Sequence, residues 1–118
     1  MTGIDYSAFS ETNLKEVVLP NSVKILENAV FSYNYNLEKI DFGSVVHMGD
    51  YQCIDCPNLR EVILPNTISH YIDTNCFEKC PKLKNIIFKG TMKEWELIAE
   101  DYLEDWLIPI HCSDGVIK

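Results

Sequence analysis

Five cysteines and three histidines are the side chains of this sequence most able to do chemistry. Two residues separate Cys53 from Cys56 and three separate Cys76 from Cys80, which resembles the two halves of a zinc site. A free cysteine also packs well as a small apolar side chain, and Cys56 and Cys80 fall at equivalent positions of a repeat. We favour reduced, buried thiols, with zinc and a disulfide as alternatives, and we predict no metal and no cofactor.

His111 stands beside Cys112, a pair that suggests a thiol nucleophile and its base. The sequence offers no obvious oxyanion site for that pair and no third group to orient the histidine. His47 and His70 are expected in loops and do not share a register. Because we find neither a phosphate-cradling glycine-rich loop nor a paired-carboxylate motif, we predict no catalytic residue and a protein that is not an enzyme.

Acidic residues outnumber basic ones by 18 to 10, which gives a net charge of −8. Phosphate binding needs clustered lysine and arginine, so we expect no direct nucleic-acid partner; a basic protein partner suits the charge, as does simple solubility. No apolar run approaches the roughly 18 residues that span a bilayer, so we expect no membrane partner. The N-terminus lacks the basic and apolar regions of a signal peptide. We predict a cytoplasmic protein, or an extracellular one if the chain belongs to a longer secreted parent.

An internal repeat of 22 to 24 residues defines the elements that must position these side chains. Apolar residues recur in three columns, which are Leu14, Leu37, Leu59 and Leu83; Val17, Ile40, Val62 and Ile86; and Leu19, Phe42, Leu64 and Phe88. Two more columns lie between them, namely Ile4, Leu26, Met48 and Ile72, and Phe9, Phe31, Cys53 and Phe77. Alternating β-branched segments such as residues 61–64 predict short strands, and stacked turns would share one core.

Several repeated sequence motifs resemble those of a known class of repeats. Ile-x-x-x-Ala-Phe, Leu-x-x-Val-x-Leu-Pro-Asn-Ser-Val and Cys-Pro-x-Leu resemble the BspA-like leucine-rich repeats, most closely over residues 4–31 and 48–88. The resemblance implies a leucine-rich-repeat solenoid with about four parallel short strands in one curved sheet and an irregular convex side. It also implies adhesion or protein binding, often at bacterial surfaces. The second unit has Gly43 where others have proline, and residues 52–53 read Gln-Cys in place of Ala-Phe.

We assign residues 1–90 to the repeats and residues 91–118 to a C-terminal helical cap. Thr91 and Glu94 have capping-box spacing, which favours a helix start. An apolar stripe follows, formed by Trp95, Ile98, Tyr102 and Trp106, and we expect it to cover the Phe88 end of the core. Residues 107–112 are expected to be extended, since Pro109 excludes helix there. The outer helix face is acidic, and we consider it either a solvated surface or an anionic docking patch formed by Glu94, Glu100, Asp101, Glu104 and Asp105.

Residues between the core positions of each strand are expected to point outward in columns. The first column is Glu16, Lys39, Glu61 and Asn85, and the second is Val18, Asp41, Ile63 and Ile87. The second column is more apolar than a solvated surface requires, and an apolar strip between charges resembles an interface centre with a polar rim. The alternative is that these side chains only stabilise the sheet through cross-strand contacts.

These patterns predict a non-enzymatic module that recognises another protein through the concave strand face, the acidic cap, or both. Two alternatives stay open: a small acidic intracellular inhibitor, phage-encoded, of a basic nucleic-acid-binding enzyme, and a fragment of a bacterial surface adhesin. The first strand, near residues 14–19, is expected to expose an unpaired edge. Homodimerisation, a covering partner and truncation are three explanations of that edge.

Overall fold

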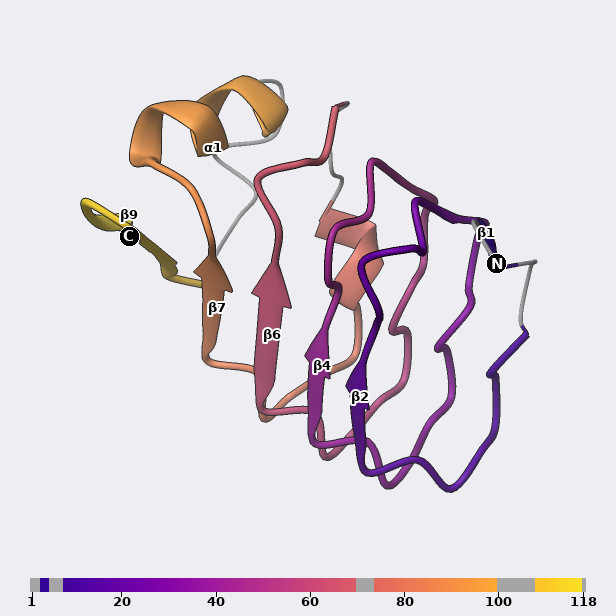
Figure 1. Cartoon of the computed structure of the whole chain (residues 1–118). Coiled ribbons are helices and arrows are strands. Elements are labelled where there is room, and N and C mark those ends of the chain that lie inside the picture. The colour runs from indigo at the N-terminus through magenta and orange to yellow at the C-terminus, as the bar shows by residue number, and fades with distance from the viewer. Residues whose placement is uncertain (1–2, 5–7, 70–73, 100–107, 118) are drawn as a thin grey trace.

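A computed structural model describes residues 3–4, 8–69, 74–99 and 108–117 of the chain. The chain coils through successive turns, and the strands of these turns lie side by side in one sheet (Figure 1). The strands of the repeats are β2 (Glu16–Val18), β4 (Lys39–Asp41), β6 (Glu61–Leu64) and β7 (Asn85–Phe88). They pair in parallel and in sequence order, which confirms the predicted solenoid.

The register of the sheet follows directly from the repeat length. Each circuit returns the chain to the same point one strand further along, so equivalent positions become neighbours. Val17 pairs with Ile40, Ile40 with Val62, and Val62 with Ile86. The last three of these side chains are fully buried, and Val17 packs against the core from the first turn. The predicted core column is therefore a column in space.

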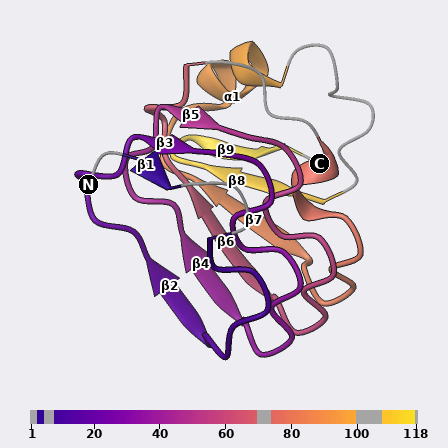
Figure 2. The same ribbon diagram turned by 90° about the vertical axis from the view of Figure 1, so that its right-hand side faces the viewer.

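A second sheet lines the opposite side of the coil (Figure 2). Among the described residues its strands, which pair in parallel, are β1 (Gly3–Ile4), β3 (Ile25–Leu26) and β5 (His47–Met48). The convex side is thus more regular than the sequence predicts, and His47 lies in a strand where a loop is expected. In the fourth turn the back of the coil contains a short 3-10 helix, η1 (Thr74–Phe77).

An aromatic column fills the interior between the two sides. The rings of Phe9 and Phe31 stack with centroids 5.8 Å apart. Phe42, from the strand side, makes edge contacts with Phe31 at 6.1 Å and with Phe77 at 6.3 Å. Cys53 stands between Phe31 and Phe77 in the repeat, and it is fully buried. Phe42 therefore bridges the rings on either side of the smaller residue.

The cap begins with helix α1 (Met92–Ile98), whose N-cap is Thr91 in a complete capping box. Trp95 is fully buried and meets the Phe88 ring edge-on at 5.2 Å, so the helix covers the end of the core as predicted. Tyr102 and Trp106, the rest of the expected stripe, lie outside the described residues. No helix in the described parts of the chain has the length and apolarity needed to span a membrane.

Residues 110–112 form a strand within the range that is expected to be extended, and they belong to a terminal hairpin that the sequence does not predict. This hairpin completes the sheet. Its strands are β8 (Ile110–Cys112) and β9 (Gly115–Ile117). β8 pairs in parallel with β7, and β9 pairs antiparallel with β8. Asp114 in the hairpin turn accepts a hydrogen bond from the Met92 backbone N–H at 2.8 Å, which ties the hairpin to the start of the helix.

Candidate functional site: the concave strand face

The outward-facing residues of the sheet form the two predicted columns. Strand pairing aligns the first column, which is Glu16, Lys39, Glu61 and Asn85, and the second, which is Val18, Asp41, Ile63 and Ile87. Val18 is 70% exposed and Ile87 is 37% exposed, while Ile63 is half-buried. In the second column, apolar side chains are therefore exposed to solvent on both sides of Asp41.

His111 extends the second column by one strand, because it pairs with Ile87 across β7 and β8. The sequence contained a signal for this position. The step from Ile87 to His111 is 24 residues, the same as the step from Ile63 to Ile87. Ile110 and Cys112 likewise follow Ile86 and Phe88 by 24 residues, so the register of the repeat continues past the helix inserted between β7 and β8.

Ion pairs connect charged residues across the sheet, from β4 to the neighbouring β6 and from β4 to the residue that follows β7. Lys39 Nζ lies 3.8 Å from Glu61 Oε2, and Lys89 Nζ lies 3.7 Å from Asp41 Oδ2. All four side chains keep some contact with water, so each pair contributes under about 1 kcal/mol to stability. The pairs order the face more than they stabilise the fold.

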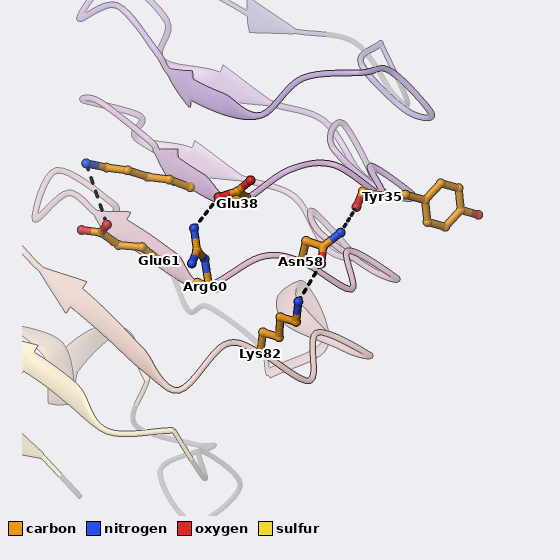
Figure 3. A network of polar contacts seen from close by, with 7 residues as sticks. Tyr35, Glu38, Asn58, Arg60, Glu61 and Lys82 are labelled. Carbon is orange, nitrogen blue, oxygen red and sulfur yellow. Dashed lines mark hydrogen bonds and ion pairs between the residues drawn. The ribbon is translucent and has the colours of Figure 1, made fainter.

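A polar network continues along one rim of the face (Figure 3). Arg60 pairs with Glu38 of the preceding turn. Lys82 Nζ donates to Asn58 Oδ1 at 2.9 Å, and Asn58 Nδ2 donates to the Tyr35 carbonyl oxygen at 2.6 Å. The network links successive turns, while the Tyr35 ring points away into solvent, 56% exposed.

Two hollows lie on the concave face. The first has a volume of about 430 Å³ and is lined by Glu16, Glu38, Lys39, Arg60, Glu61, Asn85 and Ile87. The second, of about 610 Å³, is lined by Asn85, by residues 87–89 and by residues 111–113. The hollows adjoin at Asn85 and Ile87, and their linings together reach from β2 to β8, so we refer to the two as the groove. Volumes of this size are in the range of ligand-binding sites, about 300–1,000 Å³.

The clustered cysteines lie away from this groove, inside the coil. Cys56 Sγ donates to the Phe31 carbonyl oxygen at 3.4 Å, and Cys80 Sγ donates to the Cys53 carbonyl oxygen at 2.8 Å. Burial raises the pKa of the Cys53 thiol, and a hydrogen bond with Cys56 together with burial raises that of Cys80. The cysteines are free thiols, and within the described residues no three metal-binding side chains are arranged to hold an ion. Their contacts suit a structural role.

His111 and Cys112 do not form a nucleophile and base. Adjacent residues of a strand point to opposite faces, so the imidazole lies on the concave face while the thiol packs against the core. His111 Nε2 donates to Asn85 Oδ1 at 2.7 Å, so Asn85 is the orienting group that the sequence did not reveal. Burial, with a smaller contribution from Asp114, raises the pKa of the Cys112 thiol.

The acidic cap is described only at its first residue. Glu94 Oε1 accepts a hydrogen bond from the Thr91 backbone N–H at 3.0 Å, as a capping box requires. Its other oxygen lies 3.4 Å from Asn66 Nδ2. Both oxygens therefore have partners within the chain. The remaining members of the predicted patch, Glu100, Asp101, Glu104 and Asp105, lie outside the described residues.

Comparison with known proteins agrees with this architecture. Residues 1–99 match the family described as BspA type leucine rich repeat region, with six copies. The fold is similar to the crystal structure of a leucine rich cell surface protein from Faecalibacterium prausnitzii, with a TM-score of 0.61 and 19% sequence identity. The match covers 83% of this chain and 32% of that protein, so the chain spans about a third of its length. Among curated proteins, none matches the sequence significantly.

Proposed function

Because this chain belongs to the BspA-type leucine-rich repeat family, we propose that it is a protein-recognition module whose concave face binds an extended segment of another protein. The observation that carries the proposal is the groove from β2 to β8, which the exposed side chain of Ile87 lines. Val18, in the same outward column as Ile87, is 70% exposed. Apolar side chains at the centre of a patch with charged groups at its rim are the usual make-up of a binding surface.

Side chains, rather than the backbone, would supply the binding energy. The inner strands use their backbone N–H and carbonyl groups in the parallel sheet, so a partner cannot add to them as another strand. Full burial of one isoleucine side chain contributes about 1.5–3 kcal/mol, and Ile63 and Ile87 stand on adjacent strands. The ordered charges beside them would fix the register of the partner.

A peptide library tests this proposal without a known partner. Random dodecapeptides are displayed on phage and selected on the whole chain, and enriched peptides are synthesised for fluorescence polarisation. We expect their affinity to fall at least about tenfold in Ile63→Glu/Ile87→Glu, because the substitutions bury a charge against apolar groups. Leu97→Glu is the matched control, since Leu97 is 64% exposed on α1. Unchanged binding by the folded double variant would remove the concave face from the proposal.

We also propose that the chain acts at a bacterial surface, as an adhesin or part of one. The support is the family and the printed description of the similar structure as a cell surface protein. Equilibrium binding of the purified chain to intact cells, compared with Ile63→Glu/Ile87→Glu, tests this role.

The acidity of the chain supports a second proposal, a small phage-encoded inhibitor that covers a basic surface of a nucleic-acid-binding enzyme. A net charge of −8 favours that partner, and affinity that falls steeply with added salt would be its signature. Homodimerisation through the edge of β2 is a further proposal, since among described residues β2 pairs only with β4. Light scattering at several concentrations tests it.

A further inference from the structure

The second hollow of the groove, which we call the terminal pocket, differs in charge from the rest of the chain. It is lined by Asn85, by residues 87–89 and by residues 111–113. None of the described residues that line it is acidic, although the whole chain has a net charge of −8. The adjoining hollow, in contrast, contains the carboxylates of Glu16, Glu38 and Glu61, of which the last two are paired with Arg60 and Lys39.

Lys89, which directly follows β7, and His111 on β8 both line the terminal pocket. Lys89 is half exposed and lies 3.7 Å from Asp41, which is longer than a hydrogen bond, so its ammonium N–H groups remain able to bind another acceptor. The hydrogen bond from Nε2 to Asn85 orients the His111 ring. When His111 is protonated, its Nδ1–H is a second donor available to an anion.

The floor of the pocket is apolar beside these donors. Ile87 is 37% exposed and lies between Ile63 and His111 in the second column. A ligand that fits both features has a negative group and an apolar group about one strand spacing apart, roughly 4.8 Å. Neighbouring residues of an extended peptide satisfy that requirement.

We propose that the terminal pocket binds an acidic side chain of the partner segment, with an adjacent apolar side chain of that segment on Ile87. This inference rests on the proposed function, and it assigns the terminal hairpin a role in recognition besides closing the core. An acidic side chain is favoured over a chain-terminal carboxylate, because terminal carboxylates are commonly held by free backbone N–H groups. Here the N–H of Lys89 donates to Leu64 at 2.9 Å and that of Ser113 donates to Gly90 at 2.8 Å.

The same phage selection tests this inference, since peptides fused through their C-termini offer no terminal carboxylate. We expect the enriched peptides to share an aspartate or glutamate next to an apolar residue. Replacing that acid by its amide in the synthetic peptide is expected to weaken binding about tenfold, the loss of one charge-assisted hydrogen bond. Lys89→Glu in the protein is expected to weaken binding at least as much, and His111→Gln to weaken it less.

Lys93→Glu is the matched control, because it makes the same change of charge at an exposed residue of α1. Circular dichroism and thermal melting of each variant show whether it folds. Two results would overturn this inference and leave the proposed function standing. In both, the peptides bind the Ile63→Glu/Ile87→Glu variant less tightly than the unchanged chain. They either share no acidic residue, or bind the Lys89→Glu variant as tightly as the unchanged chain. If no enriched peptide responds to Ile63→Glu/Ile87→Glu, both fail.

Discussion

One buried position of the repeat is occupied by different residue types in the first two turns and in the last two turns. In the first half, Asn34 Nδ2 donates to the carbonyl oxygens of Phe9 and Phe31, both at 2.8 Å. Its Oδ1 accepts from the backbone and hydroxyl of Thr12, at 2.9 Å and 2.6 Å. In the second half Cys56 and Cys80 occupy this position, and each thiol donates to a carbonyl oxygen of the preceding turn. The position requires a small buried donor, and the fold accepts more than one residue type for that task.

The halves differ in the aromatic column as well. Phe9 and Phe31 stack on each other in the first half, whereas Cys53 takes the equivalent place in the third turn. Phe42 compensates, since it is larger than the leucines at positions 19 and 64 and contacts the rings that flank Cys53. A small residue at the back is therefore matched by a large one from the strand side.

The largest test of this comparison removes the buried donor from each half. Asn34→Ala is expected to lower the free energy of unfolding by about 3–4 kcal/mol, because it removes a fully buried amide that partners the Phe9 carbonyl and both donors of Thr12. Cys56→Ala is expected to cost only about 1 kcal/mol, since a thiol is a weak donor. Urea denaturation of both variants measures the difference. Equal losses would mean that the two positions are not chemically distinct.

The second test concerns the exchange of volume between Cys53 and Phe42. Cys53→Phe is expected to destabilise the chain by about 2 kcal/mol, because the added ring meets Phe42. Phe42→Leu alone is expected to cost about 1 kcal/mol through the cavity that it leaves. The double variant combines phenylalanine at the back with leucine on the strand side, as in the first turn with Phe9 and Leu19, so we expect a favourable coupling of about 1–2 kcal/mol in a double-mutant cycle. Strict additivity would show that Phe42 does not fill the space above Cys53.

These comparisons explain how much of the molecule the sequence could predict. The columns were predictable because parallel stacking turns a fixed repeat length into a fixed register, as with Ile63 and Ile87. The position of β8 follows the same 24-residue step, but its antiparallel pairing with β9 was not predictable, since that pairing lies outside the repeat. The hydrogen bond between His111 and Asn85 depends on side-chain rotamers, which the spacing of residues in the sequence does not determine. The terminal pocket could therefore be identified only in the structure, although the sequence predicted the concave face on which it lies.

The smallest test concerns a feature that the two halves share. Four residues at equivalent positions have left-handed backbone conformations, with φ between 56° and 61°, and they are Glu11, Tyr33, Asp55 and Lys79. None of them is glycine, the residue that adopts this conformation at least cost. The left-handed conformation could therefore not be predicted from the spacing or the composition of the sequence.

Because the backbone is the same in both halves, relief of its strain is expected to be the same too. Glu11→Gly and Lys79→Gly each remove a backbone strain of about 1 kcal/mol. Glycine also loses more conformational entropy on folding, which offsets part of this gain. We therefore expect each substitution to raise the free energy of unfolding by about 0.5 kcal/mol. Lys84→Gly is the control, since Lys84 is exposed and is not among the residues with positive φ, and it is expected to destabilise by about 0.5–1 kcal/mol. A gain at Lys79 without one at Glu11 would show that the halves differ in backbone strain as well as in side chains.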